Sequence, residues 1–342
     1  MLENVPILSL IILIPLIGAA IIFLTGKNAK ATKVTALTFS AIPLVLSFVL
    51  LASFSLDIGT YQFRERYEWI PGLGISYSLG VDGISILMVF LTTLLCFLAI
   101  LFSWDVEHRT KEYMGLMLIL DVGVLGVFTS LDYFLFYVFW EVVLIPMYFL
   151  IAIWGGPRRD YASIKFFIYT HVASLAMLIT IMALYFEAKP VLGYASFSMI
   201  DIASVSGGFG QIFQVAAFGS LFFAFGVKMP IVPFHTWLPD AHVEAPTAGS
   251  VLLAGLLLKM GSYGIIRVAL PTLPDGASML MPLMLAIAII SILYGAIVCL
   301  AQKDLKKMVA FSSISHMGIV LLGISTGSEL GIAAAVFQMF AH

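Results

Sequence analysis

Residues 221–261 read LFFAFGVKMPIVPFHTWLPDAHVEAPTAGSVLLAGLLLKMG, two apolar runs joined by a stretch rich in proline and histidine. Each run carries one lysine among apolar residues, Lys228 in the first and Lys259 in the second. Pro230 and Pro233 follow Lys228, and because proline removes a backbone donor and clashes with the preceding turn, the helix is expected to break or kink there. A broken helix at membrane depth is tolerated only where it is buried in protein or lines a cavity, and in transporters such breaks mark ion sites.

The composition of the whole chain is that of a protein that crosses a membrane many times. Of its 342 residues, 61% are hydrophobic and only 11% are charged, whereas soluble domains have about 25% charged residues. This excludes a soluble globular enzyme, and the large apolar content excludes a disordered chain. The net charge of −2, without a basic run, argues against nucleic acid as a partner. Cys96 and Cys299 lie in apolar runs without a CxxC motif, which argues against thiolate-held zinc or iron–sulfur sites.

Ten apolar runs are long enough to cross a bilayer as helices, for which about 20 residues are needed. They lie approximately at 5–25, 31–54, 83–103, 113–130, 132–154, 163–186, 212–233, 246–269, 279–300 and 305–325. An eleventh run starts near Glu329 and reaches His342 without a stop signal, so we expect that the sequence ends in mid-helix. The sequence therefore predicts an all-α polytopic membrane protein with ten complete transmembrane helices and part of an eleventh.

Lysine and arginine in the loops predict the orientation, because loops rich in these residues stay in the cytoplasm. One side holds Lys27, Lys30, Lys33, Arg109, Lys111, Arg158, Arg159, Lys303, Lys306 and Lys307. The other side holds Arg64, Arg66, Lys189 and Arg267. The first side is therefore expected to be cytoplasmic, which places the N-terminus outside. Loop 55–81 is the longest loop and is expected to form an exposed outer hairpin or cap.

Ionisable residues near the centres of membrane helices are costly and are functional candidates by default. Glu141, Lys228 and Lys259 place one acid and two bases in three different runs, which packing alone does not explain. Four other residues also lie deep, namely Asp121, His171, His316 and, if its helix continues, His342. For the histidines, a polar contact that ties two helices together explains the pattern at least as well as a proton relay. For Asp121, a structural hydrogen-bonding role is the favoured interpretation.

A faint internal repeat relates residues 162–171 to residues 333–342. The same spacing of a small residue, an aromatic residue and a histidine occurs in Ala162, Phe166 and His171 and in Ala333, Phe337 and His342. This fits the duplicated architecture that is common among transporters.

Two other motifs do not indicate a ligand site. The glycine cluster at 207–210 lacks the following Lys-Ser/Thr of a phosphate-binding loop. His235 and His242 flank Asp240 and Glu244, but their spacing matches no zinc-binding helix motif.

The stretch from Lys228 to Gly261 is similar to the antiporter-like membrane subunits of respiratory complex I, which resemble the large subunits of multisubunit sodium/proton antiporters. A second stretch, FWEVVLIPMY at 139–148 followed by WGGPRR at 154–159, resembles subunit M of the bacterial enzyme more than its paralogues L and N. Subunit M is called subunit 4 in mitochondria. The resemblance covers the whole chain.

The resemblance implies an antiporter-like fold with inverted five-helix repeats. It divides the chain into N-terminal helices at 1–112 with the external loop 55–81, a first repeat at 113–270, and the start of a truncated second repeat at 279–342. It also carries roles over to matching positions, with Glu141 as the glutamate of the fifth helix, Lys228 as its partner lysine and Lys259 as the lysine of the eighth helix. His316 and His342 match the polar residues that continue the hydrated central axis, so these five residues form the predicted proton relay. The family's terminal acidic residue lies beyond this sequence.

The resemblance further implies a proton-translocating subunit of NADH-quinone oxidoreductase, in a chain that holds no redox centre and no metal. Quinone reduction elsewhere in the complex is expected to drive proton transfer, with NADH, FMN, iron–sulfur clusters and quinone on other subunits. The expected partners are other membrane-arm subunits, especially the paralogues L and N, and the lipid bilayer of a prokaryotic inner membrane.

Two alternatives compete with this hypothesis. A subunit of a multisubunit cation/proton antiporter would share Glu141, Lys228 and Lys259, although the sequence that follows Glu141 favours the respiratory subunit. A membrane cytochrome with His171, His316 and His342 as haem ligands is disfavoured, because each helix offers only one histidine. The electron donor, the quinone and the choice between sodium and protons stay open, as do the roles of Asp121, His171, His235 and His242.

The charge bias of the loops generates a topology prediction. A reporter fused after Arg159 or Lys307 should read as cytoplasmic, and one fused near Arg66 should read as external. The opposite pattern would show that one span upstream has been missed or counted in excess.

Overall fold

The structure is a computed structural model that describes residues 5–26 and 28–342, so Lys27, counted above among the loop cations, lies outside the described residues. The helices and strands are α1 (Ile7–Thr25), α2 (Ala29–Ser53), β1 (Gln62–Ile70), β2 (Ile75–Val81), α3 (Ser85–Phe102), α4 (Thr110–Thr129), α5 (Tyr133–Trp154), α6 (Arg159–Leu192), α7 (Met199–Val205), α8 (Gln211–Lys228), α9 (Trp237–Glu244), α10 (Thr247–Leu252), α11 (Leu258–Gly264), α12 (Leu270–Thr272), α13 (Pro274–Leu300), α14 (Leu305–Ser325) and α15 (Glu329–Ala341). Two π-helical turns, Leu253–Leu257 and Ile265–Ala269, join α10, α11 and α12 into one span.

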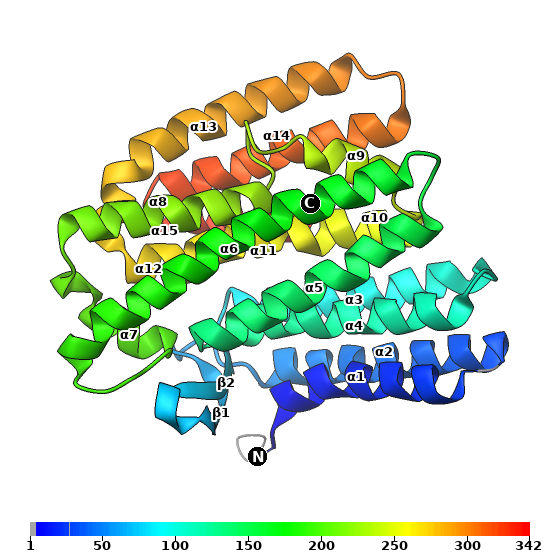
Figure 1. The fold of residues 1–342 in the computed structure, drawn as a ribbon, viewed down its shortest axis with the longest axis horizontal. Helices are drawn as coiled ribbons and strands as arrows, with labels where there is room; N and C mark the ends of the chain where they lie inside the picture. The colour runs from blue at the N-terminus through cyan, green and yellow to red at the C-terminus, as the bar shows by residue number, and fades with distance from the viewer. Residues whose placement is uncertain (1–4, 27) are drawn as a thin grey trace.

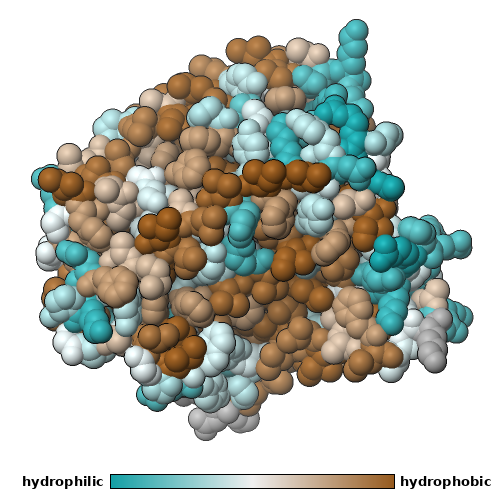
Figure 2. Space-filling view, in the orientation of Figure 1, coloured by the Kyte–Doolittle hydropathy of each residue, from teal (hydrophilic) through white to brown (hydrophobic). Residues whose placement is uncertain are grey.

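In the described ranges, ten helical spans are long and apolar enough to cross a membrane, and each coincides with one of the ten predicted runs. They are α1 to α6, α8, α13, α14 and the composite span Thr247–Thr272. The helices lie side by side along one direction (Figure 1), and apolar side chains cover most of the face between their two ends (Figure 2). The all-α membrane fold is therefore confirmed, and the chain is a multi-pass membrane protein.

Several boundaries differ from the predicted ones, and the differences in the sixth and seventh spans have physical reasons. The sixth span, expected at 163–186, extends over 34 residues as α6 and ends at Gly193, whose positive φ of 78° suits glycine. The seventh span, expected to reach residue 233, ends as a helix at Lys228, two residues before Pro230.

The loop between α2 and α3 forms a hairpin, as expected, an antiparallel pair of β1 and β2. Glu65 of β1 is buried and accepts hydrogen bonds from the backbone of Leu8 (2.8 Å) and Ser9 (3.2 Å), which caps the start of α1. Asp132 accepts from the backbone of Phe134 (2.9 Å) with one oxygen and from the backbone of Ser76 (3.0 Å) with the other. The hairpin therefore also fixes the start of α5, the helix that carries Glu141.

The loops predicted to be cytoplasmic contact one another at the opposite end of the bundle (Figure 1). Trp154 Nε1 donates to the backbone oxygen of His108 (2.8 Å), and the backbone N–H of Gly156 donates to that of Glu244 (2.8 Å). Lys306 Nζ donates to the backbone oxygen of Val243 (3.2 Å) and so ties the 301–304 loop to the end of α9. The alternation of loops between two ends agrees with the predicted order of spans.

Candidate functional site: buried lysines, glutamate and histidines

The helix that carries Lys228 breaks where the proline pattern predicts. Lys228 is the last residue of α8, and the chain then makes an irregular connection to α9. Side chains satisfy the backbone groups that the break frees: Trp237 Nε1 donates to the backbone oxygen of Val227 (2.9 Å), and the N–H of Val232 donates to Ser291 Oγ (3.0 Å). The irregular backbone is thus held within protein, as membrane depth requires.

The Lys228 side chain is 2% exposed and lies among aromatic rings. Its Nζ atom is 5.4 Å from the centre of the Trp140 ring and 5.8 Å from that of Phe166, distances at which a cation is attracted to the ring face. Among the described residues, this ammonium group has no hydrogen-bond or ion-pair partner. A lysine held only by ring faces keeps its protons free for transfer to another acceptor.

Glu141 contacts His171 instead of Lys228. Its Oε2 atom lies 3.1 Å from His171 Nδ1, while Oε1 is buried without a hydrogen-bond partner in the described part of the chain. Lys228 is near enough for its charge to interact with that of Glu141, but it forms no ion pair with it among the described residues. The resemblance predicts Glu141 and Lys228 as partners; the structure brings them near each other and leaves a gap between them.

Lys259 lies in a second cluster and is wholly buried. Its Nζ atom donates to the backbone oxygen of Ala254 (2.5 Å), which lies in the preceding π-helical turn, and is 2.7 Å from His342 Nδ1. The other nitrogen of His342, Nε2, is 3.1 Å from Ser313 Oγ. Lysine, imidazole and hydroxyl therefore form a continuous hydrogen-bonded chain from α11 to α14.

His316 joins the same cluster through an amide. Its Nδ1 atom is 3.1 Å from Gln338 Nε2, and its ring centre lies 5.3 Å from that of His342. The structure thus places the five predicted relay residues in two groups, Glu141 with Lys228 nearby, and Lys259 with both histidines.

Gly261 allows the two lysine-bearing spans to approach closely. A Cβ atom on Gly261 would lie 2.5 Å from the backbone oxygen of Phe225 and 2.6 Å from the backbone nitrogen of Met229, on either side of Lys228 in the sequence. These are rigid backbone atoms, so a larger residue would push α11 away from the end of α8.

Sequence reasoning did not assign three residues that the structure places in the site, His171, Ser313 and Gln338. Gln338 lies four residues before His342, and Ser313 three residues before His316, spacings that put each pair on one helix face. His171 was among the deep ionisable residues, but its role was left open. Serine is common in membrane helices, so of the other two only the glutamine carried a usable signal.

The polar residues around α9 have other contacts. Asp240 pairs with Lys165 (2.7 Å), and Glu244 Oε2 accepts the backbone N–H of Arg158 (2.9 Å). Burial lowers the pKa of His235, and burial together with the nearby Lys306 charge lowers the pKa of His242 to about 4. Both histidines are therefore neutral at pH 7 in this arrangement. No group of three or more metal-binding side chains occurs in the ranges 5–26 and 28–342.

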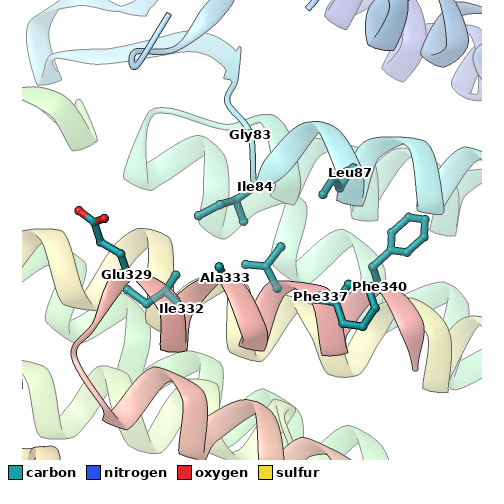
Figure 3. A pocket seen from close by; sticks show the side chains of 9 residues that line it. Gly83, Ile84, Leu87, Glu329, Ile332, Ala333, Phe337 and Phe340 are labelled. Carbon is teal, nitrogen blue, oxygen red and sulfur yellow. The ribbon is translucent and has the colours of Figure 1, made fainter. Parts of the chain in front are cut away.

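An apolar groove of about 530 Å³ lies between α3 and α15 (Figure 3). Its lining residues are Gly83, Ile84, Leu87, Glu329, Ile332, Ala333, Val336, Phe337 and Phe340. None of the five predicted relay residues lines it, so the groove is separate from the site.

We predict that Gly261→Ala lowers the free energy of unfolding by about 1–3 kcal/mol, the usual cost of overpacking a tight contact. Gly255→Ala on the same span is the control, because its Cβ would meet only the tip of the Leu95 side chain, which can rotate away. Thermal unfolding of the purified protein in detergent measures both, and equal stabilities would contradict the close backbone contact.

The sequence of this chain is similar to those of known membrane proteins. A family model described as NADH:quinone oxidoreductase/Mrp antiporter, TM, matches residues 130–342. NADH-quinone oxidoreductase subunit M of Rickettsia prowazekii (strain Madrid E) is 42% identical over 346 residues, which cover 99% of this chain and 69% of that relative.

Two solved structures share the fold. A chain of respiratory complex I from Thermus thermophilus with bound NADH has a TM-score of 0.83 at 29% identity, covering 98% of this chain and 70% of that one. A chain of the Mrp complex from Dietzia sp. DQ12-45-1b has a TM-score of 0.84 at 21% identity, covering 98% of this chain and 36% of that one, which is a similarity of fold alone. The family match and the identity to subunit M over nearly all of this sequence show that the chain belongs to the NADH-quinone oxidoreductase subunit M family.

Proposed function

We propose that this chain is a proton-translocating membrane subunit of an NADH-quinone oxidoreductase. Quinone reduction elsewhere in the complex is coupled to proton transfer through Glu141, Lys228, Lys259, His316 and His342. The observation that carries the proposal is the 2.7 Å contact between Lys259 and His342, because it joins a wholly buried lysine directly to an imidazole nitrogen.

The Lys259 contact is suited to proton transfer because its partners are neutral acceptors. A buried lysine that only fills space would be expected to pair with a carboxylate, which would hold its proton. Here the ammonium faces a backbone oxygen and an imidazole nitrogen. Imidazole accepts a proton on one nitrogen and releases one from the other, so His342 passes a proton on toward Ser313 or the neighbouring His316.

In this proposal, the separation between Glu141 and Lys228 controls proton transfer. An opposite charge nearby favours the charged form of an ionisable group. Movement of the two side chains together or apart therefore changes how tightly Lys228 holds its proton. Bound water is required to fill the spaces between the two groups of residues, since buried waters bridge polar groups that do not touch.

The assignment of membrane sides and repeats belongs to the same proposal. The N-terminus lies outside a prokaryotic inner membrane, with the loops around Arg158 and Lys307 in the cytoplasm. Residues 1–112 carry the N-terminal helices, 113–270 form a first repeat, and 279–342 begin a second, inverted one. The loops lie at two opposite ends of the bundle, as this assignment of membrane sides requires.

The partners that we propose are other membrane-arm subunits, especially the paralogues L and N. Glu141 and His171 are 23% and 39% exposed at their side chains, on the flank of the bundle formed by α5 and α6. Ionisable groups facing lipid are costly, so a neighbouring subunit that covers this flank is favourable. NADH, FMN, the iron–sulfur clusters and the quinone are bound by other subunits in this proposal, and this chain supplies proton transfer alone.

Lys259→Ala should lower proton pumping and quinone reduction together in a complex that still assembles, because a blocked relay slows the coupled electron transfer. The matched control is Lys189→Ala, which removes an exposed lysine near the end of α6. Proton uptake by vesicles and quinone reductase activity are measured per assembled complex. Unchanged activity in Lys259→Ala would leave Lys259 as a packed lysine without a role in transfer.

Lys228→Arg separates charge from proton transfer. Arginine keeps the positive charge near Glu141 but stays protonated under all practical conditions, so the variant should assemble and pump poorly. Lys228→Ala should be as poor or worse, since it removes the lysine charge near Glu141. Near-normal pumping by Lys228→Arg would make Lys228 a structural counter-ion.

Bulk is the main confounder in that experiment, because arginine is larger than lysine beside the Pro230 break. Glu141→Gln adds no volume and removes the acid. Equal loss of pumping in Glu141→Gln and Lys228→Arg would assign the defect to the chemistry of the two groups.

A further inference from the structure

We propose that His171 exchanges protons with Glu141 and is a further member of the relay, alternating with Lys228 as the group that Glu141 contacts. This inference rests on the proposed function and adds a residue on α6 to it.

The geometry of the contact is that of a proton-transfer pair. His171 Nδ1 and Glu141 Oε2 are 3.1 Å apart, within the range of about 2.6–3.2 Å required of a general acid or base. The His171 ring stacks on Phe167 with centres 5.4 Å apart and planes at 19°, and Phe167 in turn packs against Tyr148. The stacking fixes the plane of the imidazole so that Nδ1 faces the carboxylate.

Only one oxygen of the Glu141 carboxylate has a hydrogen-bond partner among the described residues. This distinguishes the contact from a purely structural one. Buried polar groups that serve only to hold helices together normally find a partner for every atom. Glu141 Oε1 is buried without a hydrogen-bond partner among the described residues, and so is free to meet a second base. Lys228 of α8 is that base, and the other ionisable groups around the pair are Tyr137 and Tyr148 of α5.

The exposed fraction falls from His171 to Glu141 to Lys228. The side chain of His171 is 39% exposed and that of Glu141 23%, whereas Lys228 is 2% exposed. The neighbours of His171 on the outer face of α6 are apolar, with Ile168 and Val172 each 53% exposed. His171 is therefore the polar member at the flank of the bundle, and a proton arriving there reaches Glu141 before Lys228.

The internal repeat gives an independent argument. His171 closes the segment 162–171 as His342 closes the segment 333–342. Each of the two histidines lies within hydrogen-bond distance of a relay residue through its Nδ1 atom, His171 to Glu141 and His342 to Lys259. This correspondence supports a similar role for the two histidines.

The step is a simple proton transfer. The Nδ1–H bond of a protonated His171 breaks, its electron pair stays on nitrogen, and an O–H bond forms on Glu141. Movement of Glu141 toward Lys228 then lets an uncharged Lys228 amine take that proton, which regenerates the carboxylate. No oxidant, reductant or other reactant is needed.

The test compares His171→Asn with His171→Phe in the whole complex reconstituted in vesicles. Asparagine places an amide donor near the position of Nδ1 and preserves the contact to Glu141, but it carries no exchangeable charge. Both variants are expected to lower pumping per assembled complex at least about fivefold, a modest part of what a positioned proton-transfer group contributes. His108→Asn, at an exposed loop histidine, is the matched control and should match wild type.

Pumping by His171→Asn within about twofold of wild type, together with a loss in His171→Phe, would overturn the proposal, since the contact alone would then suffice. If His171→Asn fails to assemble, His171→Gln is judged by the same criterion. Lys259→Ala is assayed in parallel. When wild type pumps and Lys259→Ala does not, a normal His171→Asn refutes only the role of His171. When wild type itself does not pump, the proposed function fails.

Discussion

The cost of placing charged side chains inside a membrane governs how the helices of this protein are packed. Glu141, Lys228 and Lys259 lie in spans that elsewhere are apolar, and a lone charge at membrane depth costs at least a few kcal/mol. The protein meets this cost by enclosing the lysines. The broken α8 is buried against α13 through Ser291, and Gly261 lets the neighbouring span close over the break.

The ionisable side chains fall into two kinds, which differ in how many of their possible hydrogen bonds are made. Glu65 of the hairpin accepts several hydrogen bonds from the start of α1, and Asp132 accepts several from the start of α5 and from the hairpin. Both carboxylates hold these elements together. Glu141 keeps one oxygen without a partner, and Lys228 rests only on ring faces, within the residues that the structure describes. Ionisable side chains with unused hydrogen-bonding capacity and several bases within reach are suited to proton exchange. Ionisable side chains whose hydrogen bonds are all made are suited to holding helices and strands in place.

The ten spans, the break after Lys228 and the hairpin between the second and third spans could be predicted from the sequence, because hydrophobic length, proline and loop length act locally along the chain. The five relay residues could be proposed from resemblance and from their rarity in apolar runs. The contact of Glu141 with His171 could not, because it depends on the rotation of α5 against α6. The full length of α6 could not be predicted for a different reason. Hydropathy does not mark where a helix continues beyond the bilayer. The structural hydrogen-bonding role favoured for Asp121 is not confirmed, because both of its carboxyl oxygens are buried without a hydrogen-bond partner among the described residues.

The central claim, that Glu141 changes its protonation during turnover, is tested most directly by redox-induced infrared difference spectroscopy of the assembled complex. The account predicts a carboxyl signal on reduction that shifts in heavy water and is missing in Glu141→Gln. A difference spectrum that is identical in wild type and Glu141→Gln, in complexes of equal electron-transfer competence, would contradict it.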